Sequence, residues 1–183
     1  MRKAVFFLSC LMLSACAPLV CPEADTVKSR YGKDALPTSY EANLSLRYGL
    51  FRISLNLYKS DGKFLISGEG RTAEVKGNSL CFAGSCLEIP ISPDGILFGK
   101  VLRGDERMEC SKSGLVFEKE DDLFKSKYVF MEGRLTLAEF YDKKKDRTIK
   151  LNYLEWSKEG YAKAIRVESK NTSFFLTVNS LKF

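Results

Sequence analysis

A regular alternation of apolar and polar residues over 40–58 is the feature that most restricts the fold of this chain. Apolar side chains occupy every second position of 40–48, and the pattern repeats from Phe51 to Leu57. Successive side chains of a β-strand point to opposite faces, so each run predicts a strand with one apolar and one polar face. The Ser60-Asp61-Gly62-Lys63 segment that follows is typical of a hairpin turn. The sheet is therefore expected to begin as an antiparallel meander.

Later segments extend this meander. Further strands are predicted over 64–68, 72–76, 79–82, 115–118, 127–131, 134–141, 148–156, 161–169 and 172–183. A central helix is predicted from Pro93 to Leu102, because Ser92 suits the capping position and Gly104 suits the end. A short helix is also predicted between Pro22 and Ala35. The fold class is mainly β, and a sheet of about ten strands is expected to curl or close rather than stay flat.

The N-terminal segment has the pattern of an export signal. Two basic residues precede an apolar stretch over 4–13, and Leu13-Ser14-Ala15-Cys16 resembles the bacterial lipobox. This resemblance implies a signal peptide over 1–15 and a lipidated Cys16, with Ala17 favouring the outer membrane. Residues 16–38 are then a lipidated N-terminus and tether, followed by one domain over 39–183. The alternative is an ordinary signal peptide in which Cys16 is incidental.

The composition argues against several classes of chemistry. The chain has no histidine, which excludes Ser-His-Asp and Cys-His catalysis and every histidine-containing zinc site. No GxSxG motif, phosphate-binding loop, convincing pair of catalytic carboxylates or metal-spaced acids is present. We therefore expect neither an enzyme nor a cofactor or metal. The formal net charge of +6 favours acidic head groups or an acidic partner and does not imply nucleic acid.

Four cysteines follow the expected signal, namely Cys21, Cys81, Cys86 and Cys110. Export permits disulfides, and four cysteines allow three pairings. Cys81 and Cys86 flank a short predicted turn, which makes a bridge between them plausible, and a Cys21–Cys110 pair would then tie the N-terminal segment to the domain. The functional alternative is a redox or metal site, which this spacing matches weakly.

The order of the predicted elements resembles the lipoprotein carrier and receptor family, LolA and LolB. Three segments have the best local similarity: 92–104 looks like the family's helix, 134–156 like its paired strands, and 162–183 like its closing strands. The resemblance implies an unclosed, half-barrel sheet capped by helices, with lipoprotein acyl chains held in an apolar cavity. An anchored member would be similar to the receptor. One departure is that the receptor's Pro-Leu-Gly loop has no match in this chain.

The inner face of the sheet supplies the candidate ligand-binding residues. The alternation alone predicts which side chains of each strand face inward, and a β-bulge would reverse this assignment. The apolar face is either a filled core or the lining of a pocket, which composition does not distinguish. The candidates are Leu44, Leu46, Phe51, Ile53, Leu55, Leu135, Leu137, Ile149 and Leu151.

The leading hypothesis is a lipid-anchored periplasmic module that binds acyl chains of lipoproteins or other lipids. It would serve lipoprotein localisation or insertion at the outer membrane, reaching the membrane through lipidated Cys16 and taking a periplasmic carrier protein as a further partner. The rival hypothesis is a structural or assembly lipoprotein with a filled interior, which binds an envelope protein through its outer surface. An enzyme ranks third.

Overall fold

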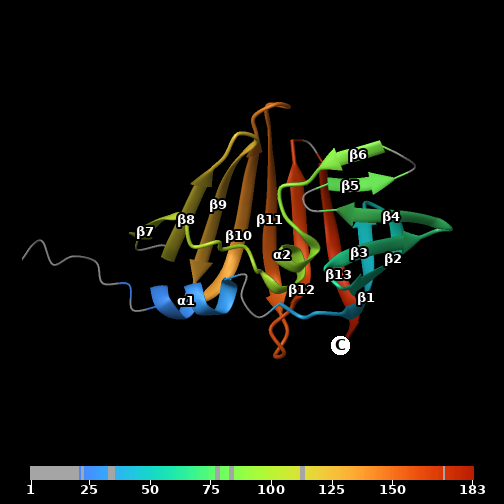
Figure 1. Ribbon diagram of the computed structural model, residues 1–183, viewed down its shortest axis with the longest axis horizontal. Coiled ribbons are helices and arrows are strands. Elements are labelled where there is room, and N and C mark those ends of the chain that lie inside the picture. The colour runs from blue at the N-terminus through green and yellow to red at the C-terminus, as the bar shows by residue number, and fades with distance from the viewer. Residues whose placement is uncertain are drawn as a thin grey trace, which may run out of the picture.

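Within the described residues, thirteen strands form one antiparallel sheet with the order β6-β5-β4-β3-β2-β1-β13-β12-β11-β10-β9-β8-β7 (Figure 1). The computed structural model describes residues 21, 23–32, 36–76, 79–82, 85–111, 114–170 and 172–183. The strands are β1 (Tyr40–Tyr48), β2 (Phe51–Ser60), β3 (Lys63–Gly68), β4 (Arg71–Lys76), β5 (Ser79–Phe82), β6 (Ser85–Glu88), β7 (Arg107–Ser111), β8 (Gly114–Glu120), β9 (Phe124–Met131), β10 (Arg134–Asp142), β11 (Arg147–Trp156), β12 (Ala162–Ser169) and β13 (Thr172–Lys182).

The sheet consists of two meanders joined at its middle. The first runs outward from β1 to β6, and the second runs inward from β7 to β13. They meet where β1 pairs with β13, with Glu41 opposite Lys182 and Leu46 opposite Leu176. The strands β6 and β7 form the two edges and do not pair with each other. The sheet is therefore unclosed, which confirms the predicted fold class.

Two short helices lie on the same side of the curved sheet (Figure 1), namely α1 (Ala24–Tyr31) and α2 (Pro93–Phe98). The Ser92 hydroxyl caps α2 by accepting a hydrogen bond from the Gly95 amide at 3.2 Å. The helix ends earlier than Leu102, because Gly99 adopts a left-handed conformation with φ of 64°. Neither described helix is long and apolar enough to cross a bilayer.

The buried side chains form two clusters, one beneath each helix. Beneath α1, Val27 and Tyr31 pack against aromatic side chains of the second meander, including Phe117, Phe130 and Phe140. Beneath α2, Leu97 belongs to a smaller cluster built on β1 to β4 and β13. The cluster beneath α1 is the larger and holds most of the buried aromatic side chains, whereas the cluster beneath α2 is mainly aliphatic.

The chain's organisation adds detail to the predictions. The short helix predicted between Pro22 and Ala35 is α1, which is packed into the core. The predicted strands are present, and β6 and β7 add to them, which gives thirteen strands in the described residues. Cys16 and the signal sequence over 1–15 lie outside the described residues.

Candidate functional site

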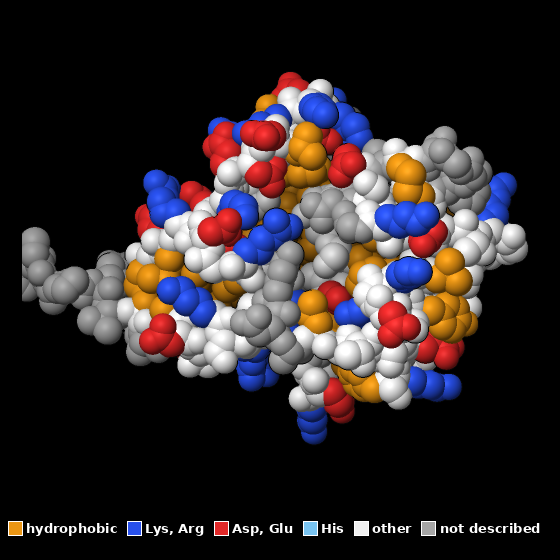
Figure 2. Space-filling view, viewed as in Figure 1, with side chains coloured by type: hydrophobic (Ala, Val, Ile, Leu, Met, Phe, Trp, Pro, Cys, Tyr) orange, Lys and Arg blue, Asp and Glu red, His pale blue; other side chains and the backbone are white. Residues whose placement is uncertain are grey.

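An apolar cavity of about 380 Å³ lies between α2 and the inner face of the sheet. Its eighteen lining residues are all apolar. They are Leu44, Leu46, Leu55, Leu57, Ile66, Val75, Leu80, Ile89, Pro90, Ile91, Pro93, Ile96, Leu97, Ile149, Leu151, Val167, Phe174 and Leu176. In the space-filling view, apolar side chains are visible toward the middle of this face, and charged side chains surround them (Figure 2).

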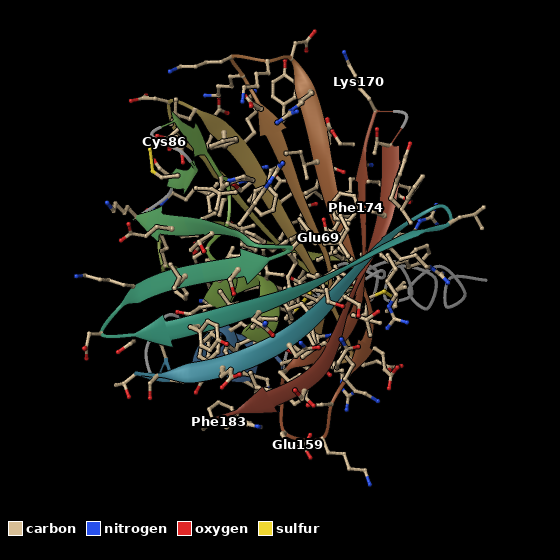
Figure 3. All side chains as sticks on the ribbon, turned by 90° about the vertical axis from the view of Figure 1, so that its right-hand side faces the viewer. Glu69, Cys86, Glu159, Lys170, Phe174 and Phe183 are labelled. Carbon is tan, nitrogen blue, oxygen red and sulfur yellow. A yellow bond between two sulfur atoms is a disulfide. The ribbon has the colours of Figure 1, made fainter. Side chains whose placement is uncertain are left out.

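Strand register explains why these side chains meet. Leu44 lies directly opposite Leu55 in the β1–β2 pair, and Leu46 lies opposite Leu176 in the β1–β13 pair. Directly opposed residues point to the same face of a sheet, so one continuous aliphatic surface crosses the three strands. Phe174 reaches the cavity from the beginning of β13 (Figure 3). The cavity therefore needs both meanders, since β1 belongs to one and β13 to the other.

The structure places five of the nine candidate residues around the cavity, namely Leu44, Leu46, Leu55, Ile149 and Leu151. Phe51 begins β2 and is 76% exposed, and Ile53 is half-buried without lining the cavity. Leu135 is fully buried in the core beneath α1.

Leu137 was assigned to the wrong face. The register between β9 and β10 shifts between Leu135 and Leu137, and the inward positions that follow are Ala138 and Phe140. A β-bulge reverses which side of a strand the later residues face. Alternation without knowledge of the bulge therefore put Leu135 and Leu137 on one side.

The segment from Ile89 to Leu97 supplies a third of the lining and was not among the candidates. It includes the start of α2 and the chain leading into it, where no period-two pattern marks an inner face. Phe174 and Leu176 on β13 were also missed, because Phe175 lies between them and the apolar run over 174–176 does not show which side chains face inward.

A buried ion pair attaches α2 to the sheet beside the cavity. Lys59 Nζ lies 2.7 Å from Asp94 Oδ2, and both side chains are only 6% exposed. The Tyr40 hydroxyl donates a 3.0 Å hydrogen bond to Asp94 Oδ1. Lys59 also lies over the Phe64 ring, 5.3 Å from its centroid. Burial, and next the Asp94 carboxylate, raise the pKa of Tyr40 far above its ordinary value, so the hydroxyl stays a donor.

A third polar contact holds the same turn of α2. The hydroxyl of Tyr153 on β11 donates a 3.1 Å hydrogen bond to the Gly95 carbonyl. Burial raises the pKa of Tyr153, which keeps that hydroxyl neutral. Gly95 packs so closely that an added Cβ would lie 2.6 Å from Ile91 Cγ1. The first turn of α2 is thus fixed over the cavity from both meanders.

The lining determines what the cavity can do chemically. It offers no described side chain able to donate a proton, act as a nucleophile or hold a metal. Across the described ranges, no group of three or more acidic or cysteine side chains is placed to ligate a metal ion. Apolar surface of this kind binds hydrocarbon through the hydrophobic effect and dispersion.

All four described cysteines are paired. Cys81 and Cys86 lie directly opposite each other on β5 and β6 and form a disulfide at one edge of the sheet (Figure 3). Cys21 is bonded to Cys110 on β7, at the other edge. The second bond joins the N-terminal end of the described chain to the sheet.

Comparison with known proteins identifies the fold. No family model and no curated protein sequence matches the chain. Two solved structures are similar over 88% of this chain and 90% of their own. One is a domain provisionally named as an outer membrane lipoprotein-sorting protein from Vibrio parahaemolyticus, with a TM-score of 0.51 and 15% identity. The other is a DUF1329 family protein from Desulfovibrio piger, with a TM-score of 0.50 and 14% identity. The likeness is one of fold.

Proposed function

We propose that the protein is a non-enzymatic module that binds acyl chains of lipids, with lipoproteins as the intended cargo. The observation that carries this proposal is the cavity of about 380 Å³ whose lining is entirely apolar. Ligand pockets have volumes of roughly 300–1,000 Å³, so the space suits part of an acyl chain. Each methylene group moved from water into such a site contributes about 0.8 kcal/mol.

The absence of polar groups in the lining also supports a hydrocarbon ligand. A specific small molecule is usually oriented by a few polar groups inside its pocket, and this lining has none. Hydrocarbon needs no such groups, because burial of its surface is not directional. The lining therefore favours an acyl chain over a ligand with polar functions.

The proposed setting is the periplasmic side of the outer membrane, with the protein anchored through lipidated Cys16. The lipobox-like Leu13-Ser14-Ala15-Cys16 sequence supports the anchor. The name of the Vibrio parahaemolyticus neighbour is in keeping with a role in lipoprotein sorting. The β1–β2 turn presents Leu50, which is fully exposed, beside Phe51. Such an apolar tip is suited to contact a membrane during delivery, after cargo arrives from a periplasmic carrier.

A second candidate is an assembly lipoprotein that binds an envelope protein through its outer surface. The filled aromatic core beneath α1 and the exposed apolar side chains of the β1–β2 turn favour it. Acyl-chain binding by the cavity distinguishes the two candidates.

The test compares two neighbouring residues of β3 that point to opposite faces. Ile66 lines the cavity, whereas Leu65 faces outward and is 43% exposed. We expect the domain from Cys21 onward, which contains every described element, to bind a fluorescent fatty-acyl probe saturably. Ile66→Glu is expected to weaken binding by tenfold or more, because it places a charge in the apolar site. Leu65→Glu is expected to bind as the unchanged domain does.

Native mass spectrometry of the same proteins provides a second measurement. Co-purified lipid or acylated peptide is expected on the unchanged domain and on Leu65→Glu, and not on Ile66→Glu. The proposal fails if a domain with native circular dichroism binds no lipid and no probe, or if both variants bind equally well.

A further inference from the structure

A second cavity, of about 340 Å³, lies where the ends of α1 and α2 meet the turn between β11 and β12. Glu159 in that turn and Phe183 lie at the same end of the molecule (Figure 3), and both line this cavity. It shares no lining residue with the apolar cavity. We call it the basic pocket, because four of its lining residues are Arg30, Lys100, Arg134 and Lys158.

The cations of the basic pocket come from separate parts of the chain. Arg30 is in the last turn of α1, Arg134 begins β10, and Lys158 belongs to the β11–β12 turn. None of these three side chains forms an ion pair with any acid of the described chain, including Glu159, the one acidic residue in the lining. Lys100 Nζ donates a 2.7 Å hydrogen bond to the Arg30 carbonyl.

Some cations elsewhere on the described surface are neutralised by acids. Across the described part of the chain, eleven ion pairs join lysine or arginine to an acid, and several lie side by side on the outer face of β8 to β11. In the basic pocket, by contrast, four cations from separate elements line one hollow with a single acidic side chain, which favours an anion there. The basic pocket therefore has the electrostatics of an anion site.

Rigid aromatic rings form the floor beneath these cations. The Trp156 indole donates a 3.0 Å hydrogen bond to the Leu135 carbonyl, and its ring packs edge-on against Tyr31 at 6.0 Å between centroids. Gly99 passes so close that an added Cβ would lie 2.9 Å from Tyr31 and 3.0 Å from Trp156. Fixed rings of this kind can hold the carbon part of a ligand whose anionic end meets the arginines.

We propose that the basic pocket binds a phosphate group carried on a carbon framework. Guanidinium groups match phosphate oxygens with two parallel hydrogen bonds, and two arginines from different elements can grip one phosphate from two sides. The phosphate could belong to a phospholipid head group or to a soluble phosphate ester. The proposal does not depend on acyl-chain binding, because the two cavities are separate.

The test measures the fluorescence of Trp156, which lines the basic pocket. Trp156 is the single tryptophan of the chain, so its fluorescence reports on this pocket in the full-length protein. The full chain is held in micelles of dodecyl maltoside, a detergent without phosphate, and titrated with inorganic phosphate and with glycerol 3-phosphate. In parallel, its emission is compared in such micelles with and without added phosphatidylglycerol. Calorimetry of the two soluble phosphates detects binding that leaves the emission unchanged.

The double variant Arg30→Ala/Arg134→Ala is expected to weaken the response about tenfold, since charge-assisted hydrogen bonds are lost. Lys144→Ala removes an exposed lysine in the β10–β11 turn, at the opposite end of β10 from Arg134, and is expected to respond as the unchanged protein does. A response to glycerol 3-phosphate assigns the site to a soluble phosphate ester, and one to phosphatidylglycerol alone assigns it to a lipid head group. A response to inorganic phosphate alone, no response to any of them, or equal losses in both variants would overturn the proposal.

Discussion

Lys59 places a positive charge on the apolar side of the sheet, and Asp94 makes that arrangement stable. Lys59 lies on the same, inward-facing side of β2 as Leu55 and Leu57, and its side chain is buried. Burying a charge in this way is very unfavourable unless an opposite charge and hydrogen bonds compensate for it. The carboxylate of Asp94 and the ring of Phe64 provide that compensation.

We therefore predict that Asp94→Asn lowers the free energy of unfolding by about 3–5 kcal/mol, because it leaves the Lys59 ammonium buried without a counter-ion. Urea denaturation followed by circular dichroism measures this change. The paired replacement Lys59→Met with Asp94→Leu removes both charges and is expected to restore most of the loss.

The matched control is Asp105→Asn, which breaks the Lys119–Asp105 ion pair, in which Asp105 is exposed. Water screens exposed pairs of this kind, so this variant is expected to remain near the stability of the unchanged protein. Equal effects of Asp94→Asn and Asp105→Asn would contradict the structural role assigned to the buried pair.

At the scale of elements, the two disulfides close loops of very different length. Cys21 and Cys110 are 89 residues apart, whereas Cys81 and Cys86 are five apart. Loop-closure entropy predicts that removing the long-range bond by Cys21→Ala/Cys110→Ala costs about 4–5 kcal/mol of stability. Removing the hairpin bond by Cys81→Ala/Cys86→Ala is expected to cost about 2 kcal/mol. Thermal unfolding of both double variants without reductant measures the difference, and the reverse order would contradict the prediction.

Elements differ in how far the sequence predicts them, and the reasons are local. Alternation over 40–58 correctly predicts β1 and β2, because regular strands repeat with a period of two. It fails for Leu137 because a bulge adds a residue without any sequence mark. The prediction that α2 reaches Leu102 extends beyond Gly99, whose left-handed conformation ends the helix.

The candidate site shows the same limit. Leu44, Leu46 and Leu55 could be selected because alternation places them on one face. The helix α2 and its contact through Asp94 depend on chain segments that come together only in the folded molecule. A usable signal did exist for Lys59, which occupies an inward position of an apolar strand, where a lysine needs a buried partner.

At the scale of the whole molecule, the two halves of the sheet differ in how their inner faces are packed. The half beneath α1 is packed with buried side chains that include many aromatic rings, and the half beneath α2 surrounds the apolar cavity. Side chains that border an empty space lose the dispersion contacts that a packed neighbour would supply. Local opening should therefore need less free energy around α2 than around α1.

Hydrogen exchange measured by mass spectrometry tests this difference. We predict faster amide exchange in β3 and β4 than in β9 and β10, although both pairs have neighbours on each side. A saturating fatty-acyl ligand is expected to slow exchange in β3 and β4 and to leave β9 and β10 unchanged. Uniform exchange, or a ligand effect on β9 and β10 alone, would contradict the placement of the cavity beneath α2. Ile66→Glu is the control, and the ligand should then slow neither pair.

The pairing of β1 with β13 also determines the order in which the molecule can acquire its ligand. A ribosome makes β1 near the start and β13 after every other strand, yet Leu46 and Leu176 face each other across one strand pair. A partly made chain can form the outward meander and most of the inward one, because those pairings are between neighbours in the sequence. It lacks the wall that Phe174 and Leu176 provide until translation has passed them. If the cavity holds an acyl chain as proposed, only a chain whose synthesis has passed β13 can retain it, and a product that stops before β13 would lose it.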